Sequence, residues 1–195
     1  ITLISAISIS CAFSAVPVML ELKNHDSENK TVEVHMVNSA GCKLLGTDAY
    51  NTEITDSLAC VDNGSGGNTW FSGAVGGFQF LLNGMTGMSV VDDATSLISA
   101  NGLDAAANDA TSMVLGYSLT GGSISSGSGM LLKIGYSTLE GSDPCFVQST
   151  TGCEPSSTAN MISDTGSNCV DSKWDDSCTL DISDFSANLV DDFSI

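Results

Sequence analysis

The chain contains no arginine, and its basic residues other than two histidines are five lysines, against 23 aspartates and glutamates. Over 195 residues this gives a formal net charge of -18 at pH 7. Without arginine there is no guanidinium fork to bind phosphate, and a chain this acidic repels a polyanion at long range. The sequence therefore predicts that neither nucleic acids nor nucleotides are partners.

Sequence signatures of catalysis are also missing. A Ser-His-Asp hydrolase needs a serine that is activated by a nearby histidine, and no G-x-S-x-G motif occurs. His25 lies in a predicted polar turn and His35 on the predicted outward face of a strand. A carboxylate pair for glycoside hydrolysis cannot be singled out in so acidic a chain. We therefore predict that the protein is not an enzyme.

Charged residues are scarce, at 14%, whereas hydrophobic residues make up 42% of the chain. This length and apolar content suffice for one compact domain, and two full domains are not expected. Serine, threonine, asparagine and glycine must then provide much of the contact with water. Such a composition suits a secreted β-protein.

The N-terminal residues 1–15 are apolar or small, like the later part of a secretory signal peptide, and the run is short for a membrane span. We interpret it as a signal-peptide remnant that precedes a single domain over residues 16–195. The alternative is a strand that stays in the mature protein and completes the sheet of a neighbouring subunit. Either way, the predicted location is secreted, extracellular or at the cell surface.

The chain has seven cysteines, and removal of Cys11 with the N-terminal run leaves an even number. In an exported protein an even number of cysteines indicates disulfides. Zinc is the rival interpretation, but there is no C-x-x-C pair and both histidines lie far from the late cysteines. Proximity in the sequence favours the pairs Cys42–Cys60, Cys145–Cys153 and Cys169–Cys178.

Apolar side chains recur at every second position, which is typical of half-buried strands. Strands are predicted at residues 16–22, 31–38, 76–84, 88–91, 112–119 and 130–137. We expect one face of each strand to be buried between two sheets. The residues that share such a face are Val32, Val34 and Met36; Phe78, Phe80 and Leu82; Met113, Leu115, Tyr117 and Leu119; and Met130, Leu132, Ile134 and Tyr136.

One short helix is predicted after residue 91. Asp92 or Asp93 is the expected N-cap, Leu97 and Ile98 belong to its apolar stripe, and Gly102 ends it. The Gly/Ser-rich segment 120–129 joins two predicted strands and is of the kind that lets a chain change sheets or turn a corner.

Two segments depart from the alternation. Residues 41–72 are predicted to be an insertion that the Cys42–Cys60 disulfide holds together, and residues 141–179 form a cysteine-rich segment. Within the latter, residues 145–178 are expected to be a disulfide-held loop rather than another core layer. The predicted fold class is all-β: an immunoglobulin-like or jelly-roll β-sandwich with one short helix and disulfide-held loops.

Four segments resemble, in their order, the cohesin-like β-sandwich domains of the carbohydrate-binding/cohesin superfamily in secreted microbial proteins. The segments are TVEVHMVNS, VGGFQFLLNGM, ATSLISANG and MVLGYSLTGGSISSGSGMLLKIGYS. The resemblance spans roughly residues 16–40 and 73–140, and implies an extracellular sandwich that acts by binding or assembly rather than by catalysis. Cohesins proper bind dockerin modules through one sheet face. Because residues 41–72 and the cysteine-rich segment depart from the family pattern, no dockerin-binding residue is carried over.

Calcium is the cofactor that the acidic loops could bind, because clustered oxygen ligands suit a hard cation. The candidate ligands are Asp171, Asp175 and Asp176, with Asp92 and Asp93 second. For each of these aspartates the alternative is a helix cap or a solvated charge.

Trp70 and Trp174 each lie in a predicted polar loop. An exposed indole there would stack on a sugar ring, whereas a buried one would plug the edge of the sandwich, which is the role we favour.

These observations favour a secreted, non-enzymatic domain for cell-surface adhesion, extracellular matrix or scaffold assembly. Its expected partner is a protein or a polysaccharide at the cell surface. Two alternatives remain open: a carbohydrate-binding module of a secreted enzyme, and a filament subunit that self-assembles by exchange of its N-terminal strand.

Overall fold

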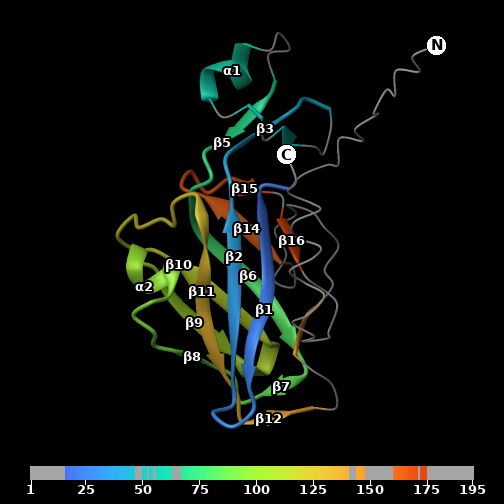
Figure 1. Cartoon of the computed structure of the whole chain (residues 1–195), viewed down its shortest axis with the longest axis vertical. Coiled ribbons are helices and arrows are strands. Elements are labelled where there is room, and N and C mark those ends of the chain that lie inside the picture. The colour runs from blue at the N-terminus through green and yellow to red at the C-terminus, as the bar shows by residue number, and fades with distance from the viewer. Residues whose placement is uncertain are drawn as a thin grey trace, which may run out of the picture.

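The structure is a computed structural model, and it describes residues 16–46, 50–51, 53–54, 56–62, 67–140, 144–147, 160–170 and 172–174. Over these residues the chain is mostly β-structure in several antiparallel sheets, with two short α-helices and one 3-10 turn, η1, at Asp109–Thr111. Figure 1 shows β1, β2 and β11 running along the long axis of the molecule, with β6 and β14 in a second layer behind them.

The five-stranded sheet has the order β16-β1-β2-β11-β8. All its neighbouring strands are antiparallel except β1 and β16, which are parallel. The predicted strand at 31–38 is confirmed with the same bounds, and the first strand extends beyond residue 22. The strands are β1 (Val18–Asp26), β2 (Thr31–Asn38), β8 (Ser89–Val91), β11 (Gly127–Gly135) and β16 (Ser172–Trp174).

The six-stranded sheet has the order β15-β14-β6-β10-β9, and β13 pairs with β6 off this path. The Gly/Ser-rich segment after β10 carries the chain from this sheet to β11 in the five-stranded sheet, as predicted. The strands are β6 (Val75–Asn83), β9 (Asp104–Asn108), β10 (Met113–Tyr117), β13 (Cys145–Phe146), β14 (Met161–Asp164) and β15 (Cys169–Val170).

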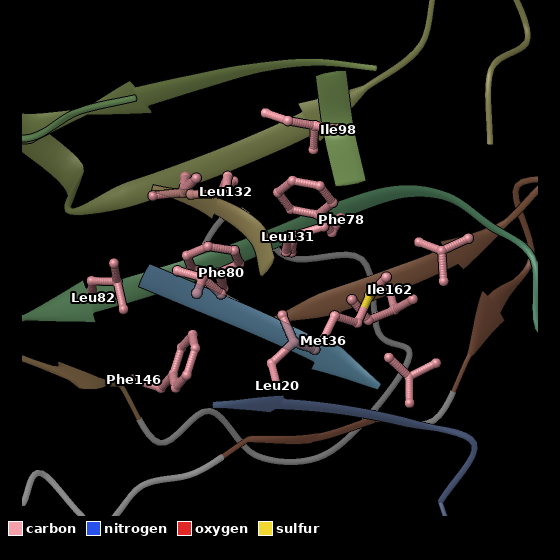
Figure 2. Packing of buried hydrophobic residues seen from close by; sticks show 14 of the residues in the cluster. Leu20, Met36, Phe78, Phe80, Leu82, Ile98, Leu131, Leu132, Phe146 and Ile162 are labelled. Carbon is pink, nitrogen blue, oxygen red and sulfur yellow. The ribbon is translucent and has the colours of Figure 1, made fainter. Parts of the chain in front are cut away.

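Both sheets contribute side chains to one hydrophobic core, and Figure 2 shows these side chains pointing into a common space. The ring of Phe80, on β6, lies 5.4 Å from that of Phe146 and 5.8 Å from that of Trp174, on the other sheet. The predicted burial of one face of β2 and of one face of β6 is confirmed. The residues concerned are Val32, Val34, Met36, Phe78, Phe80 and Leu82.

Strand β10 is in the opposite orientation to the one that its apolar pattern predicts. Val114 is fully buried, whereas Leu115 is 40% exposed. The reason is the pairing of β10 with β6, which sets Gly116 opposite Phe78. A Cβ atom at residue 116 would overlap the Phe78 ring, so only a glycine fits on the inner face there. Met113, Leu115 and Tyr117 share a face as predicted, but that face is the outer one.

A β-bulge in β11 changes which of its side chains are buried. In β11 the pairing with β2 skips Leu131, so Met130 lies opposite His35 and Leu132 opposite Val34. The extra residue moves Met130 to the outer face and places both Leu131 and Leu132 in the core. Burial of Leu132, Ile134 and Tyr136 is confirmed, and burial of Met130 with them is wrong.

The predicted helix forms as α2 (Leu97–Asn101), and Gly102 ends it in the left-handed conformation with φ of 68°. Its N-cap is Ser96, not Asp92 or Asp93, because the Ser96 hydroxyl accepts a hydrogen bond from the backbone N–H of Ser99. A second helix, α1 (Ser57–Asp62), contradicts the prediction of one helix only.

The described part of segment 41–72 forms a small unit at one end of the molecule, where β3, β5 and α1 lie together in Figure 1. Its sheet has the order β4-β3-β5, and a disulfide joins Cys42 on β3 to Cys60 on α1, as predicted. At the opposite end β7 (Met85–Thr86) pairs with β12 (Thr138–Leu139). The strands of the small sheet are β3 (Gly41–Lys43), β4 (Tyr50–Asn51) and β5 (Thr69–Phe71).

The described residues of the cysteine-rich segment, 144–147, 160–170 and 172–174, form strands that contribute to the core, which corrects the prediction of a loop for them. Its short strands extend both sheets, and Phe146, Ile162 and Val170 are buried. Ile162 lies opposite Phe78 in the pairing of β14 with β6. Strands of two to four residues carry too little alternation to be detected by period, and here each contributes one or two large apolar side chains.

Substitution of Gly116 by alanine tests this packing. The new methyl group would collide with the Phe78 ring, so we expect the free energy of unfolding to fall by about 1 to 3 kcal/mol. Chemical denaturation measures the change. Leu115→Ala, one residue away on the outer face, is the control and should cost less than about 1 kcal/mol. Equal stability of Gly116→Ala and the wild type would show that residue 116 does not face the core.

Candidate binding surface

The outer face of β10 carries an exposed row of large apolar side chains, here called the β10 ridge: Met113, Leu115, Tyr117 and, two residues beyond the strand, Leu119. Leu115 is 40% exposed, Tyr117 36% and Leu119 84%, while Met113 is half-buried. Large apolar side chains at consecutive outward positions of one strand are a patch rather than scattered surface residues. Exposed apolar patches are common at sites of interaction, so the β10 ridge is the candidate binding surface.

The neighbouring strands place both apolar and polar residues beside the ridge. Residues that lie opposite each other on paired strands share a face of the sheet. Met113 lies opposite Leu81 and Asn108, and Leu115 lies opposite Ala106 and Gln79. Leu81 is buried, whereas Ala106 is exposed on the edge strand β9. One acidic residue borders the ridge directly, because Asp104 lies opposite Tyr117, and a second, Asp109, follows the edge strand β9 at its other end.

The outer face of the five-stranded sheet is different, because it carries a network of charged groups centred on Glu33. The Oε2 atom of Glu33 accepts hydrogen bonds from Asn24 at 2.7 Å and from His35 at 2.9 Å, and Oε1 lies 3.6 Å from Lys133 Nζ. Partial burial raises the pKa of Glu33, but the hydrogen bonds from His35 and Asn24 outweigh it, so the pKa lies below its ordinary value.

Lys133 joins this network to the loop that precedes α2. Its Nζ donates to Asp93 Oδ2 at 3.0 Å, and Thr95 donates to Asp93 Oδ1 through its hydroxyl at 2.6 Å and its backbone N–H at 2.9 Å. The bonds from Thr95, and then that from Lys133, lower the pKa of Asp93 to about 2. The same contact with Asp93 raises the pKa of Lys133. Asp93 therefore anchors a turn to the sheet.

A further ion pair on this face lies within β1. Lys23 Nζ contacts Glu21 Oε1, and Glu21 is almost fully buried, with no described residue donating a hydrogen bond to its Oε2 atom. Burial lowers the pKa of Lys23.

Asp92 and Asp93 are the second group of predicted calcium ligands. Of these, Asp93 binds a cationic side chain of the chain itself, since it accepts a hydrogen bond from Lys133. Within the part of the chain that the structure describes, no three His, Cys, Asp or Glu side chains are grouped so that they could hold a metal ion. Asp171, Asp175 and Asp176 lie outside the described residues.

Both tryptophans lie on strands, not in the polar loops that were predicted. Trp174, on β16, packs against the core, with its ring 5.3 Å from Phe146 and 5.8 Å from Phe80. These contacts favour the plugging role over sugar stacking for Trp174. Trp70, on β5, is half-buried and lies opposite Cys42.

Three cysteines with described structure besides Cys42 are bonded. Cys60 pairs with Cys42, and Cys145 and Cys169 are disulfide-bonded as well. The predicted partners of Cys145 and Cys169 are Cys153 and Cys178, which lie outside the described residues, so those two pairings stay predictions.

The chain matches no family model, no curated protein and no solved structure. Among the residues that the structure describes, no helix is long and apolar enough to cross a membrane. The function therefore has to be inferred from the surface itself.

Sequence reasoning identified the members of the β10 ridge as one face but placed that face in the core. The signal that could have reversed the prediction is Gly116, because a glycine between Leu115 and Tyr117 offers room for an aromatic side chain of a neighbouring strand.

The low pKa of Asp93 predicts how acid affects the turn before α2. A carboxyl whose pKa is lower in the folded than in the unfolded chain stabilises the fold above its unfolded pKa, and this contribution is lost as the pH falls toward about 2. We expect Asp93→Asn to be less stable than the wild type near neutral pH, and the difference to shrink between about pH 4 and about pH 2. Urea titrations at several pH values measure it, and a difference that is independent of pH would contradict the role of the carboxylate.

Proposed function

We propose that the chain is an exported, non-enzymatic β-sandwich domain that binds another protein at the cell surface or in the extracellular matrix. A sandwich of the immunoglobulin-like or jelly-roll type is supported by two sheets that share one core and by the Gly/Ser-rich segment that passes between them. The order of segments that resembles cohesin-like domains fits the same class of protein.

Export is supported by the disulfides. The Cys42–Cys60 bond fixes α1 to the small sheet, and Cys145 and Cys169 are bonded too. Disulfides persist in oxidising surroundings and are rare in the cytosol. A six-residue helix such as α1 is too short to be stable alone, which makes a covalent link useful there.

The observation that carries the binding function is the exposure of the β10 ridge. In a strand with one buried face, the buried side chains are apolar and the outward side chains are normally polar. Here Leu115 and Tyr117 occupy outward positions next to the fully buried Val114. Removing these apolar side chains from water against a partner would favour binding.

A protein partner fits this face better than a sugar does. Sugar-binding surfaces use exposed indoles, and Trp174 is instead packed against Phe80 and Phe146. The β10 ridge contributes aliphatic side chains and one tyrosine, which is the composition of protein interfaces.

A phage library of random peptides, panned against the disulfide-intact full chain, tests the proposal. We expect enriched peptides to bind the wild type and to lose at least tenfold in affinity for Leu115→Asp, because a buried unpaired carboxylate costs more than about 1.4 kcal/mol. Leu58→Asp, with the same change at an exposed leucine on α1, is the matched control and should bind as the wild type does.

Peptides that bind the wild type, Leu115→Asp and Leu58→Asp equally well would contradict the role of the β10 ridge. A glycan array run in parallel tests the alternative: sugar binding that is lost in Trp70→Ala would favour a carbohydrate-binding module.

A further inference from the structure

The lysines of the chain are distributed very unevenly over the fold. None of the strands of the six-stranded sheet contains a lysine, and residues 44–132 contain none at all. Four of the five belong to the five-stranded sheet or to its first turn, and the fifth to the small sheet. They are Lys23, Lys30, Lys133, Lys173 and Lys43.

The lysines with described side chains are also engaged within the fold. Lys23 contacts Glu21, Lys133 binds Asp93, and Lys30 donates to the backbone oxygen of Ser137 at 2.9 Å. Lys43 lies over the ring of Tyr50, with its Nζ 5.8 Å from the ring centre. The ion pairs described for these lysines are with acids on or beside the five-stranded sheet, namely Glu21, Glu33 and Asp93.

The border of the ridge is acidic. Asp104, on the edge strand β9, lies opposite Tyr117, and it is exposed. Asp109 is exposed at the far end of β9, and one of its oxygens accepts a hydrogen bond from the backbone of Met88. Neither aspartate forms an ion pair with any residue that the structure describes. An apolar centre with an uncompensated negative rim is therefore what a partner meets.

We infer that the partner of the β10 ridge is a protein segment that presents aliphatic or aromatic side chains flanked by lysine or arginine. The inference rests on the proposed function and specifies its partner. Charges at the rim of an interface must be complementary, and they mainly raise the association rate. A second copy of this chain does not fit, because two molecules of charge -18 repel each other and the ridge would bring acidic rims together.

The peptides selected in the panning experiment are the probe. Peptides that need Leu115 should contain more Lys and Arg than Asp and Glu relative to the unselected library. Their association rate should fall about tenfold or more when NaCl is raised from about 50 to about 500 mM, since salt screens rim charges.

A pair of matched variants locates the charge effect. Asp104→Asn with Asp109→Asn removes two acids beside the ridge, and Glu28→Gln with Glu53→Gln removes two exposed acids on the β1–β2 turn and in the small unit. Both variants change the net charge from -18 to -16 (-18 + 2). We expect the first to slow association of the basic peptides about two- to tenfold and the second to change it by less than about twofold.

The outcomes separate the two levels of the proposal. The inference would be overturned, with the proposed function left standing, if the Leu115-dependent peptides had no excess of Lys and Arg. The same holds if their association rates did not change with salt or with the Asp104→Asn/Asp109→Asn variant. A dimer of the chain in sedimentation that Leu115→Asp disrupts would also overturn it. If no selected peptide distinguishes Leu115→Asp from the wild type, the proposed function itself fails.

Discussion

The contact between Phe78 and Gly116 decides which face of β10 the molecule buries. Phe78 projects inward from β6, and its ring occupies the space that a side chain at residue 116 would need. Glycine is the one residue that leaves this space free, so β10 must turn Val114 and Gly116 inward. The period of a strand is two, and the whole set of odd-numbered residues from Met113 to Tyr117 is thereby forced outward. The exposed ridge is thus a consequence of how the core is filled.

The outer faces of the two large sheets expose different kinds of side chain. On the five-stranded sheet, Glu33 and Lys133 belong to a network that links three strands and the turn before α2. Each exposed pair contributes little to stability, but together they fix the positions of the charges. On the six-stranded sheet the described residues form no comparable network, and Asp104 and Asp109 at its edge form no ion pair with any of them. The proposed partner, an apolar protein segment flanked by basic residues, matches the second of these faces and not the first.

Sequence patterns predicted the long strands well and the short ones badly, for a physical reason. In β2 and β6 the inward residues are large and apolar over at least three alternate positions, so phase and burial could both be predicted. In β10 the sequence allows either set of alternate residues to be buried, because Gly116 has no side chain that would show which face is apolar. The pairing with β6 determines which set faces the core. The bulge at Leu131 and the strands of the cysteine-rich segment depend in the same way on pairing with distant residues. Trp174 could not be placed in the core without knowing that β16 pairs with β1.

Hydroxyl-radical footprinting of the native chain, read by mass spectrometry at single residues, tests the orientation of β10 most directly. The account predicts strong oxidation of Leu115, Tyr117 and Leu119 and protection of Phe78, Phe80 and Val114, with all six oxidised after unfolding and reduction. Protection of Leu115 and Tyr117 in the native chain, together with oxidation of Phe78 or Val114, would contradict it.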